Sequence, residues 1–219
     1  MQYRIFILSP ANATGKRAEM LFSPRAGFEL AVRFREAGAT IGEVFSFVSG
    51  LYFRGKLSYA NRFCKSPQEV PGVLVITSDR GLLNAEALIT KEDLHSFSEV
   101  SIDPASTRYV DSLRKSAIEI VERLPEDSEV VLLGSISSRK YVELLLEIFR
   151  DRLKFPLDFI GRGDMSRGGL MLRCVEANTE LQYSPVAGAI RHGKRPPKLE
   201  PKRWTNVALN RGDRRPPEA

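Results

Sequence analysis

Three short apolar runs constrain the fold of this chain more than any other feature. They are Arg4–Leu8, Val73–Thr77 and Glu129–Leu133, and each is followed by small or hydroxyl-bearing residues. Runs that are apolar on both faces are typical of parallel strands covered by helices on both sides. Because helical patterns separate them, the order predicts right-handed crossovers and an α/β fold with an open, mainly parallel sheet flanked by helices.

Helix ends are marked by residues that cap backbone groups. Ser23-Pro24 predicts a helix start, Gly38 its end, and Thr40–Glu43 a capping box for the next helix. The helix expected after Gly50 carries one apolar face, which indicates a core thiol at Cys64; the face comprises Phe53, Leu57, Ala60 and Cys64.

The second half of the chain gives further expectations. Residues 84–105 read as largely irregular, with a helical turn at Lys91–Phe97, and a strong helix is expected at 107–123. Ser137 or Ser138 is expected to cap another helix.

Alternation near the C-terminus predicts a β-hairpin. Its expected strands are Leu170–Val175 and Glu180–Tyr183. We therefore expect a single α/β domain over 1–188, followed by an extended, disordered, Pro-rich basic tail over 189–219.

The net charge of +6 belongs to that tail. It holds nine Lys or Arg against three Asp or Glu, which leaves 24 of each sign in residues 1–188. Attraction to DNA or RNA would therefore come from residues 189–219, where Trp204 could stack on a base. A solvated terminus without a specific partner is the alternative.

Several classes are excluded by composition. No run approaches the roughly 20 apolar residues of a membrane helix, so no membrane association is expected, and the N-terminus lacks the features of a signal peptide. Two cysteines fit a reducing, cytoplasmic location. His95 and His192 are too few and too scattered for a zinc site or a Ser-His-Asp triad, so neither a metal nor a cofactor is expected.

Ligands of parallel sheets bind outside the carboxyl ends of the strands. Three loops must lie there, Ser9–Arg17, Thr77–Gly81 and Gly134–Ser138, and their small residues let backbone N–H groups approach a phosphate or carboxylate. The predicted ligand-binding residues in them are Ser9, Asn12, Gly15, Lys16, Ser78, Arg80, Gly81, Gly134 and Ser135. Strand-to-helix turns also use Gly and Ser for conformational reasons alone.

Known nucleotide-binding motifs are absent from these loops. Thr14-Gly-Lys-Arg17 lacks the first glycine and the magnesium-binding hydroxyl of a P-loop. No Gly-x-Gly-x-x-Gly follows the first strand, which excludes the usual dinucleotide site.

Gly161–Gly169 is the most unusual segment, with four glycines and two arginines in nine residues. Arg162 and Arg167 would suit a phosphate, and Asp164 could serve as a general base or accept a sugar hydroxyl. Asp164 and Arg162 are the predicted catalytic residues, and the predicted ligand-binding residues are Gly161, Gly163, Ser166 and Arg167. The alternative is a loop before a hairpin, with Asp164 paired to an arginine.

Tyr52–Lys56 combines aromatic and basic side chains, which could stack on a base and grip a backbone. Phe53 is expected in the core, whereas Tyr52 and Arg54 remain open, and Arg54 joins the predicted ligand-binding residues.

Taken in order, several segments resemble a small bacterial Rossmann-like family whose members are largely uncharacterised. The matching segments within residues 4–165 are Leu8-Ser9, Tyr52–Ala60, Val75–Leu83, the helix at 107–123, Val131–Ser135, Lys140-Tyr141 and Pro156-Leu157. Some family members occur beside or fused to transglycosylase-like enzymes that put deazaguanine bases into DNA. The chain departs from the family at Ser9-Pro10, where Cys-Ser is usual, and at 170–183, where the predicted hairpin replaces a closing helix.

Three functions stay open. The resemblance implies an enzyme acting on a nucleotide, nucleoside or nucleic-acid base, with glycosidic-bond chemistry as one reaction; Asp164, Arg162, Ser9 and Arg80 would then be its working residues. The tail favours a non-catalytic nucleic-acid-binding or adaptor protein. The strand-end loops also suit a binding module for a small anionic metabolite, such as a phosphate-bearing ligand.

Overall fold

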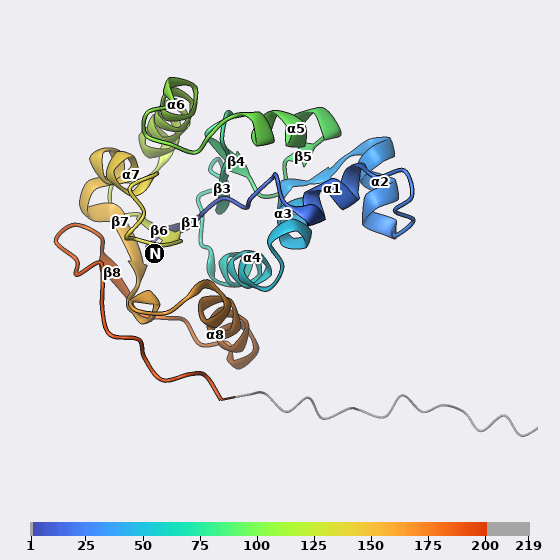
Figure 1. Ribbon diagram of the computed structural model, residues 1–219. Coiled ribbons are helices and arrows are strands. Elements are labelled where there is room, and N and C mark those ends of the chain that lie inside the picture. Colours follow the sequence, from blue (N-terminus) through green and yellow to red (C-terminus); the bar gives the residue numbers. More distant parts are fainter. Residues whose placement is uncertain (1, 201–219) are drawn as a thin grey trace, which may run out of the picture.

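The protein is an α/β sandwich in which helices cover both faces of one sheet (Figure 1). The computed structural model describes residues 2–200. Its strands are β1 (Arg4–Leu8), β2 (Ala39–Thr40), β3 (Val73–Ile76), β4 (Leu82–Asn84), β5 (Leu88–Ile89), β6 (Glu129–Leu133), β7 (Leu153–Pro156) and β8 (Tyr183–Pro185). Its helices are α1 (Lys16–Phe22), α2 (Glu29–Ala37), α3 (Ile41–Ser49), α4 (Leu51–Phe63), α5 (Lys91–Glu99), α6 (Thr107–Arg123), α7 (Val142–Phe149) and α8 (Asp164–Ala177), with short 3₁₀ turns η1 (Arg150–Arg152) and η2 (Leu157–Phe159).

The main sheet has six strands in the order β4-β3-β1-β6-β7-β8. The central four are parallel, and β4 and β8 pair antiparallel at the edges. The predicted open, mainly parallel α/β sheet is confirmed. Because the chain moves from β1 outward to β3 and then crosses to β6 on the other side of β1, the topological switch lies between β1 and β6.

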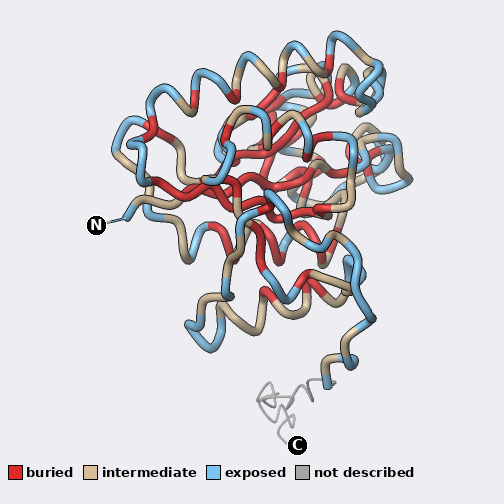
Figure 2. The backbone as a smooth tube through the Cα atoms, turned by 90° about the vertical axis from the view of Figure 1, so that its left-hand side faces the viewer, coloured by how far each residue is buried: buried red, intermediate tan, exposed pale blue. Residues whose placement is uncertain are grey.

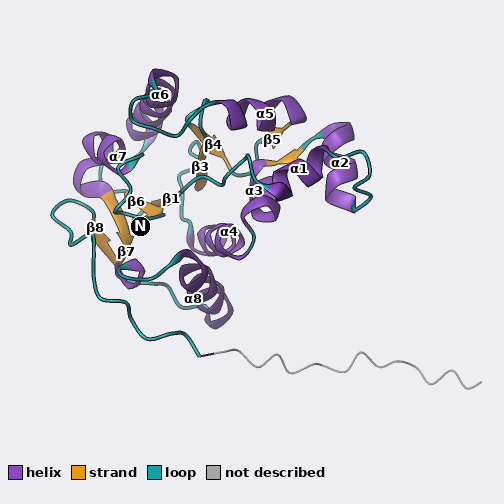
Figure 3. Cartoon of the chain, in the orientation of Figure 1, coloured by secondary structure: helices purple, strands orange, loops and turns teal. Residues whose placement is uncertain are grey.

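Alternate residues of the central strands feed two cores. In β1, Phe6 and Leu8 face the core under α4 and α8, whereas Ile5 and Ile7 face the core under α6 and α7. Figure 3 shows these helix pairs on opposite sides of the strands, and Figure 2 shows the strands as a buried centre inside partly exposed helices. Burial on both faces explains why the strands are continuously apolar.

The predicted C-terminal hairpin is wrong. Leu170–Val175 lies inside α8, and of the two expected strands only the end of the second contributes, as β8 beside β7. The helix packs against α4 where Gly55 and Gly168 meet, because a Cβ on Gly55 would lie 2.7 Å from the Gly168 carbonyl oxygen. Tertiary packing therefore overrides the weak alternating pattern.

Other element boundaries differ from expectation for local reasons. Ser23 ends α1 rather than starting a helix, and α2 begins at Glu29. Tyr141 precedes α7 in place of a serine cap. Residues 84–105 hold β5 and α5, whose start is fixed by a capping box at Thr90 that the sequence reading missed.

The remaining helix predictions are confirmed. The helix at 107–123 has the expected bounds, and Thr40 forms its capping box with Glu43. Gly38 ends α2 with a φ of 81°, a conformation that favours glycine. Gly50 immediately precedes α4.

Residues 189–200 have no regular secondary structure and run back across α8. Arg191 ion-pairs with Glu143, and the Ser137 hydroxyl donates to the Arg191 carbonyl at 2.7 Å. This stretch therefore contacts the domain. Residues 201–219, with Trp204, lie outside the described residues.

Both cysteines are free thiols that pack against the core, as expected for Cys64. Burial raises the pKa of Cys64 and of Cys174, which makes both thiols weak nucleophiles at neutral pH. Within residues 2–200, no helix combines the length and apolarity needed to span a membrane.

Candidate ligand site at the carboxyl edge of the sheet

A buried lysine on α4 marks the carboxyl end of β1. The Lys56 side chain reaches over Ser9, the residue that follows β1, and its Nζ donates to the Ser9 carbonyl oxygen at 2.6 Å and the Ser9 Oγ at 2.9 Å. Lys56 is 1% exposed and Ser9 7% exposed. Over the described part of the chain, no carboxylate forms an ion pair with Lys56.

Aromatic rings surround the rest of the ammonium group. Its nitrogen lies 4.6 Å from the ring centroids of both Tyr52 and Phe53, a distance at which a ring face attracts a cation. Burial lowers the pKa of Lys56 to about 7, and the Asp164 carboxylate pulls it upward. The amine therefore exchanges a proton near neutral pH, which is unusual for lysine.

The second strand end is brought to Ser9 by a glycine. A Cβ at Gly134, directly after β6, would lie 2.9 Å from both the Ser9 Cβ and the Tyr141 hydroxyl. The Tyr141 hydroxyl accepts from the Ser135 N–H at 3.2 Å. Burial raises the pKa of Tyr141, and hydrogen bonds from Ser138, Ser135 and Ser9 oppose the rise.

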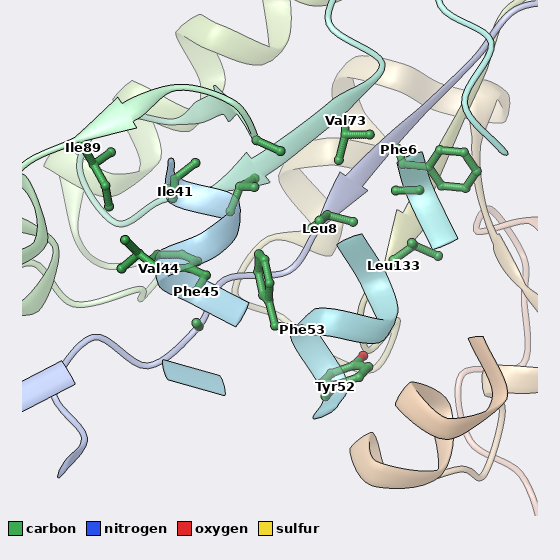
Figure 4. Close-up of a cluster of buried hydrophobic side chains, with 14 of the residues drawn as sticks. Phe6, Leu8, Ile41, Val44, Phe45, Tyr52, Phe53, Val73, Ile89 and Leu133 are labelled. Carbon is green, nitrogen blue, oxygen red and sulfur yellow. The ribbon is translucent and has the colours of Figure 1, made fainter. Parts of the chain in front are cut away.

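These residues form a polar cluster at the sheet's topological switch, which we call the switch-point cluster: Ser9, Tyr52, Lys56, Gly134, Ser135 and Tyr141. Figure 4 shows Leu8 and Leu133, the last residues of β1 and β6, beside Phe53 of α4, with Tyr52 at the margin of the apolar side chains. The Tyr52 hydroxyl is buried and makes no well-formed hydrogen bond in the described chain. Burial raises the pKa of Tyr52, and the nearby Arg167 guanidinium opposes that rise.

A groove opens beside this cluster. It encloses about 640 Å³ and is formed by the loop after β1, the C-terminal end of α5 with the residues that follow it, and Lys140 from the loop after β6. Pro10 and Ala11, which follow Ser9 directly, line it. Two strand-end loops, after β1 and β6, and the α5–α6 connection thus meet at the edge where parallel sheets bind ligands.

The groove is polar and carries both charge signs. Its lining comprises Pro10, Ala11, Asn12, Ala13, Thr14, Phe97, Ser98, Glu99, Val100, Ser101, Ile102 and Lys140. Asn12, a predicted ligand-binding residue, lies here with its Oδ1 accepting from the Thr14 N–H at 3.0 Å. Gly15 and Lys16 are at the start of α1, outside this lining.

The loop after β3 packs against α5 and α6 and contributes no residue to the switch-point cluster. Ser78 is buried and donates to the Phe97 carbonyl at 2.8 Å, and Arg80 ion-pairs with Asp93. Gly81 has a φ of 66°, and a Cβ there would lie 2.2 Å from the Ser112 carbonyl oxygen. This predicted loop therefore joins α5 and α6 to the sheet.

Arg54 is on the exposed side of α4. It lines a separate groove, also of about 640 Å³, among α1, α2 and α3, together with Arg17 and Arg33. The structure does not bring Arg54 to the switch-point cluster.

The Gly161–Gly169 segment is the start of α8 rather than a free loop. Arg167 is buried, and its guanidinium donates to the Phe159 carbonyl at 2.9 Å. The Asp164 carboxylate lies 3.5 Å from the Arg167 guanidinium, which agrees with the alternative prediction that Asp164 pairs with an arginine. Arg162 instead donates to the Ser166 hydroxyl at 3.3 Å.

Packing explains most of the glycines in this segment. A Cβ at Gly161 would lie 2.2 Å from the Lys194 carbonyl oxygen, and one at Gly168 would lie 2.8 Å from the Leu51 carbonyl oxygen. Gly163 is the N-cap of α8 and has open space around it. The predicted catalytic residues Asp164 and Arg162 therefore have different partners at one helix start and do not form an ion pair with each other.

Of the predicted residues, Ser9, Gly134 and Ser135 meet in the cluster, and Arg167 lies beside it. Lys56 and Tyr141 were not among the predicted site residues; Lys56 entered only as part of the Tyr52–Lys56 motif, whose basic side chains were alternatively expected in solvent, and it is buried instead. The available signal for Lys56 was its position in a buried stripe, four residues after Tyr52 and three before Tyr59, where a lysine is out of place. Tyr141 carried no such signal because it resembles any core aromatic.

The residues from 2 to 200 contain no group of three or more His, Cys, Asp or Glu side chains that could hold a metal ion. The fold and the cluster define an α/β protein with a polar crevice at the topological switch of its sheet. Comparison with protein-family models, with curated proteins and with solved structures produced no match.

Proposed function

We propose that this protein binds a nucleotide, nucleoside or nucleobase in the groove beside the switch-point cluster. The observation that carries the proposal is the buried Lys56 amine on Ser9, without a carboxylate, at the sheet edge where ligands bind.

A buried lysine lowers the stability of the fold, so stability does not explain its presence here. Burying an ionisable amine has a free-energy cost, whether the amine keeps its charge or gives up its proton, and an apolar side chain of similar volume would avoid that cost. Two hydrogen bonds and two ring faces reduce the cost but supply no opposite charge. Groups with strongly shifted pKa values at a crevice are typical of functional sites.

The groove suits a ligand of nucleoside size. Its volume of about 640 Å³ lies within the range of small-molecule sites. Asn12, Ser98 and Ser101 offer hydrogen-bonding groups for a base or a sugar, and Lys140 offers a cation for a phosphate. The family resemblance points to the same ligand class, as an analogy.

Proton transfer is the catalytic extension of this proposal. An amine with a pKa of about 7 can give or take a proton at neutral pH. Its hydrogen-bond partner at 2.9 Å, the Ser9 hydroxyl, directly precedes Pro10 in the groove lining. The Asp164 carboxylate acts on the charge of the same amine from the start of α8.

Thermal-shift measurements with nucleosides, their 5′-monophosphates and free bases test the proposal. We expect at least one of them to stabilise the wild type by about 2.7 kcal/mol at 100 times its Kd. The Lys56→Met variant should fold but lose most of this stabilisation, and Ser9→Ala should reduce it.

Ser128→Ala is the matched control, because Ser128 is a buried serine just before β6, at the opposite edge. It should keep the full ligand response. The proposal fails if no compound in the panel stabilises the wild type, or if Lys56→Met responds as the wild type does.

A further inference from the structure

A second cavity lies on the far side of the α8 start, where residues 195–199 cross the helix. It encloses about 350 Å³. Its cationic side chains are Arg162 and Arg173 from the domain and Arg195 and Lys198 from the crossing segment. We call it the basic pocket.

No acidic side chain lines the basic pocket. Within residues 2–200, none of its four cations forms an ion pair with a carboxylate. Arg162 donates to Ser166 and to the Pro197 carbonyl, and Arg173 donates to the Glu200 carbonyl. Four positive charges around one cavity repel each other, so an anion that enters relieves that repulsion.

The helix itself adds to this potential. Gly163 caps α8 without a side-chain hydrogen bond, which leaves the first backbone N–H groups directed out of the helix. The Asp164 carboxylate in the same turn pairs with Arg167 and is absent from the pocket lining. In addition, the Arg162 Nε is buried and has no hydrogen-bond partner in the described chain.

The pocket depends on close approach of the crossing segment. Gly161 has a φ of 72°, and a Cβ there would lie 2.2 Å from the Lys194 carbonyl oxygen. Gly161 therefore lets the segment that carries Arg195 and Lys198 come close to the two domain arginines. The geometry thus unites two features that looked separate in the sequence, the glycine-rich segment and the basic tail.

We infer that the basic pocket binds a phosphate group, and that the phosphate belongs to the backbone of a nucleic-acid strand. Arginine forks match phosphate oxygens, and no shape-specific contact to a base or sugar is needed. A strand is favoured over a free nucleotide because Arg195 and Lys198 are exposed and the next residues, 201–219, add five Lys or Arg against two acids. This site is separate from the switch-point groove and does not rest on the function proposed for it.

The double variant Arg195→Gln/Lys198→Gln tests this inference. Both side chains are exposed and have no partner in the described residues, so the fold should be unchanged. We expect binding of a 20-nucleotide single-stranded DNA to weaken about ten-fold or more. The slope of log K against log salt should fall by about 1.4, because two phosphate contacts are lost.

Arg25→Gln/Lys115→Gln is the matched control, since it removes the same two charges from exposed positions elsewhere. It should bind the DNA nearly as the wild type does. The inference is overturned if both double variants lose affinity equally, because binding then follows net charge alone.

Pyrophosphate separates the two sources of phosphate. One outcome is that pyrophosphate stabilises the wild type but not Arg195→Gln/Lys198→Gln, while both proteins bind DNA equally. The basic pocket then binds phosphate, and its assignment to nucleic acid is overturned. If neither ligand distinguishes the variant from the wild type, the whole inference fails. Nucleoside binding at the groove, measured in the same variant, should stay intact in every case.

Discussion

The two ends of the central strands treat buried charge in opposite ways. At the amino edge, Glu129 at the start of β6 receives a hydrogen bond from Arg4 Nε at 2.7 Å and ion-pairs with Lys154. Arg4 also pairs with Glu180. At the carboxyl edge, Lys56 is buried more deeply yet has only a carbonyl, a hydroxyl and two rings.

The pKa values at the two edges reflect this difference. Burial alone would raise the pKa of Glu129, but hydrogen bonds from Lys154 and Arg4 outweigh burial and lower it. Burial lowers the pKa of Lys56 to about 7, and only Asp164 opposes the change. The charges of the amino edge therefore balance and join β1, β6 and β7. The carboxyl edge instead keeps a buried amine with a shifted pKa and, within residues 2–200, no carboxylate paired to it, which is typical of a functional site.

The largest expected effect is an alkaline gain in stability that Lys56 alone causes. Between pH 7 and 9.5 the unfolded chain holds the proton of Lys56 and the folded chain does not, so the free energy of unfolding rises with pH. With an unfolded pKa of 10.5 and a folded pKa of about 7, the gain is about 3 kcal/mol over this window.

Urea unfolding of the wild type and Lys56→Met at intervals of half a pH unit measures this gain. The difference between the two proteins isolates Lys56, since the tyrosines and cysteines are common to both. Parallel curves from pH 7 to 9.5 would show that Lys56 has an ordinary pKa and would remove the contrast between the edges.

A smaller effect is expected at the amino edge, in the acid range. Glu129→Gln should lower the free energy of unfolding by about 2 kcal/mol at pH 7, because Arg4 and Lys154 lose their shared carboxylate. Since the folded pKa of Glu129 lies below 4.5, this stabilisation is present above pH 4.5 and is lost as the pH falls through the folded value.

The deficit of Glu129→Gln should accordingly shrink below pH 4. The exposed Glu119→Gln variant serves as the control and should match the wild type throughout. An equal deficit at pH 7 and at pH 3 would mean that packing, not charge, ties the strands at this edge.

The smallest effect compares the same substitution at both edges. Ser9→Ala should lower the free energy of unfolding by about 1 kcal/mol, since Lys56 loses one of two acceptors. Ser128→Ala should be neutral or slightly stabilising, because the buried Ser128 hydroxyl has no partner in the described structure. Chemical denaturation at pH 7 measures both, and a reversed order would contradict the assignment of Ser9 as a Lys56 ligand.

Strands and helices were predicted correctly from the sequence where the local apolar pattern agrees with the burial in the fold. The three apolar runs became β1, β3 and β6, and the amphipathic segment at 107–123 became α6 with the expected bounds. The hairpin prediction failed at α8, because the glycines and the mild alternation of this segment are also typical of a hairpin. The feature that favours the helix is the close contact of Gly168 with Gly55. That contact joins residues more than a hundred positions apart, so no local pattern contains it.

The candidate site was predicted in part. Ser9 and Gly134 follow strands, and strand ends of a parallel sheet converge by topology. Lys56 lies in the middle of a helix, and its partner is 47 residues earlier. Only packing of α4 on β1 gives its amine a role.

Apolar periodicity and charge distribution are properties of the chain, so the parallel core, the balanced charge of residues 1–188 and the basic C-terminal segment follow from sequence alone. Which strand-end loops form a site and which only pack is set by contacts between distant residues, because those contacts fix burial and hydrogen-bond partners. Arg80 forms an ion pair with Asp93, whereas Lys56 lies over Ser9 with no carboxylate of the described chain paired to it.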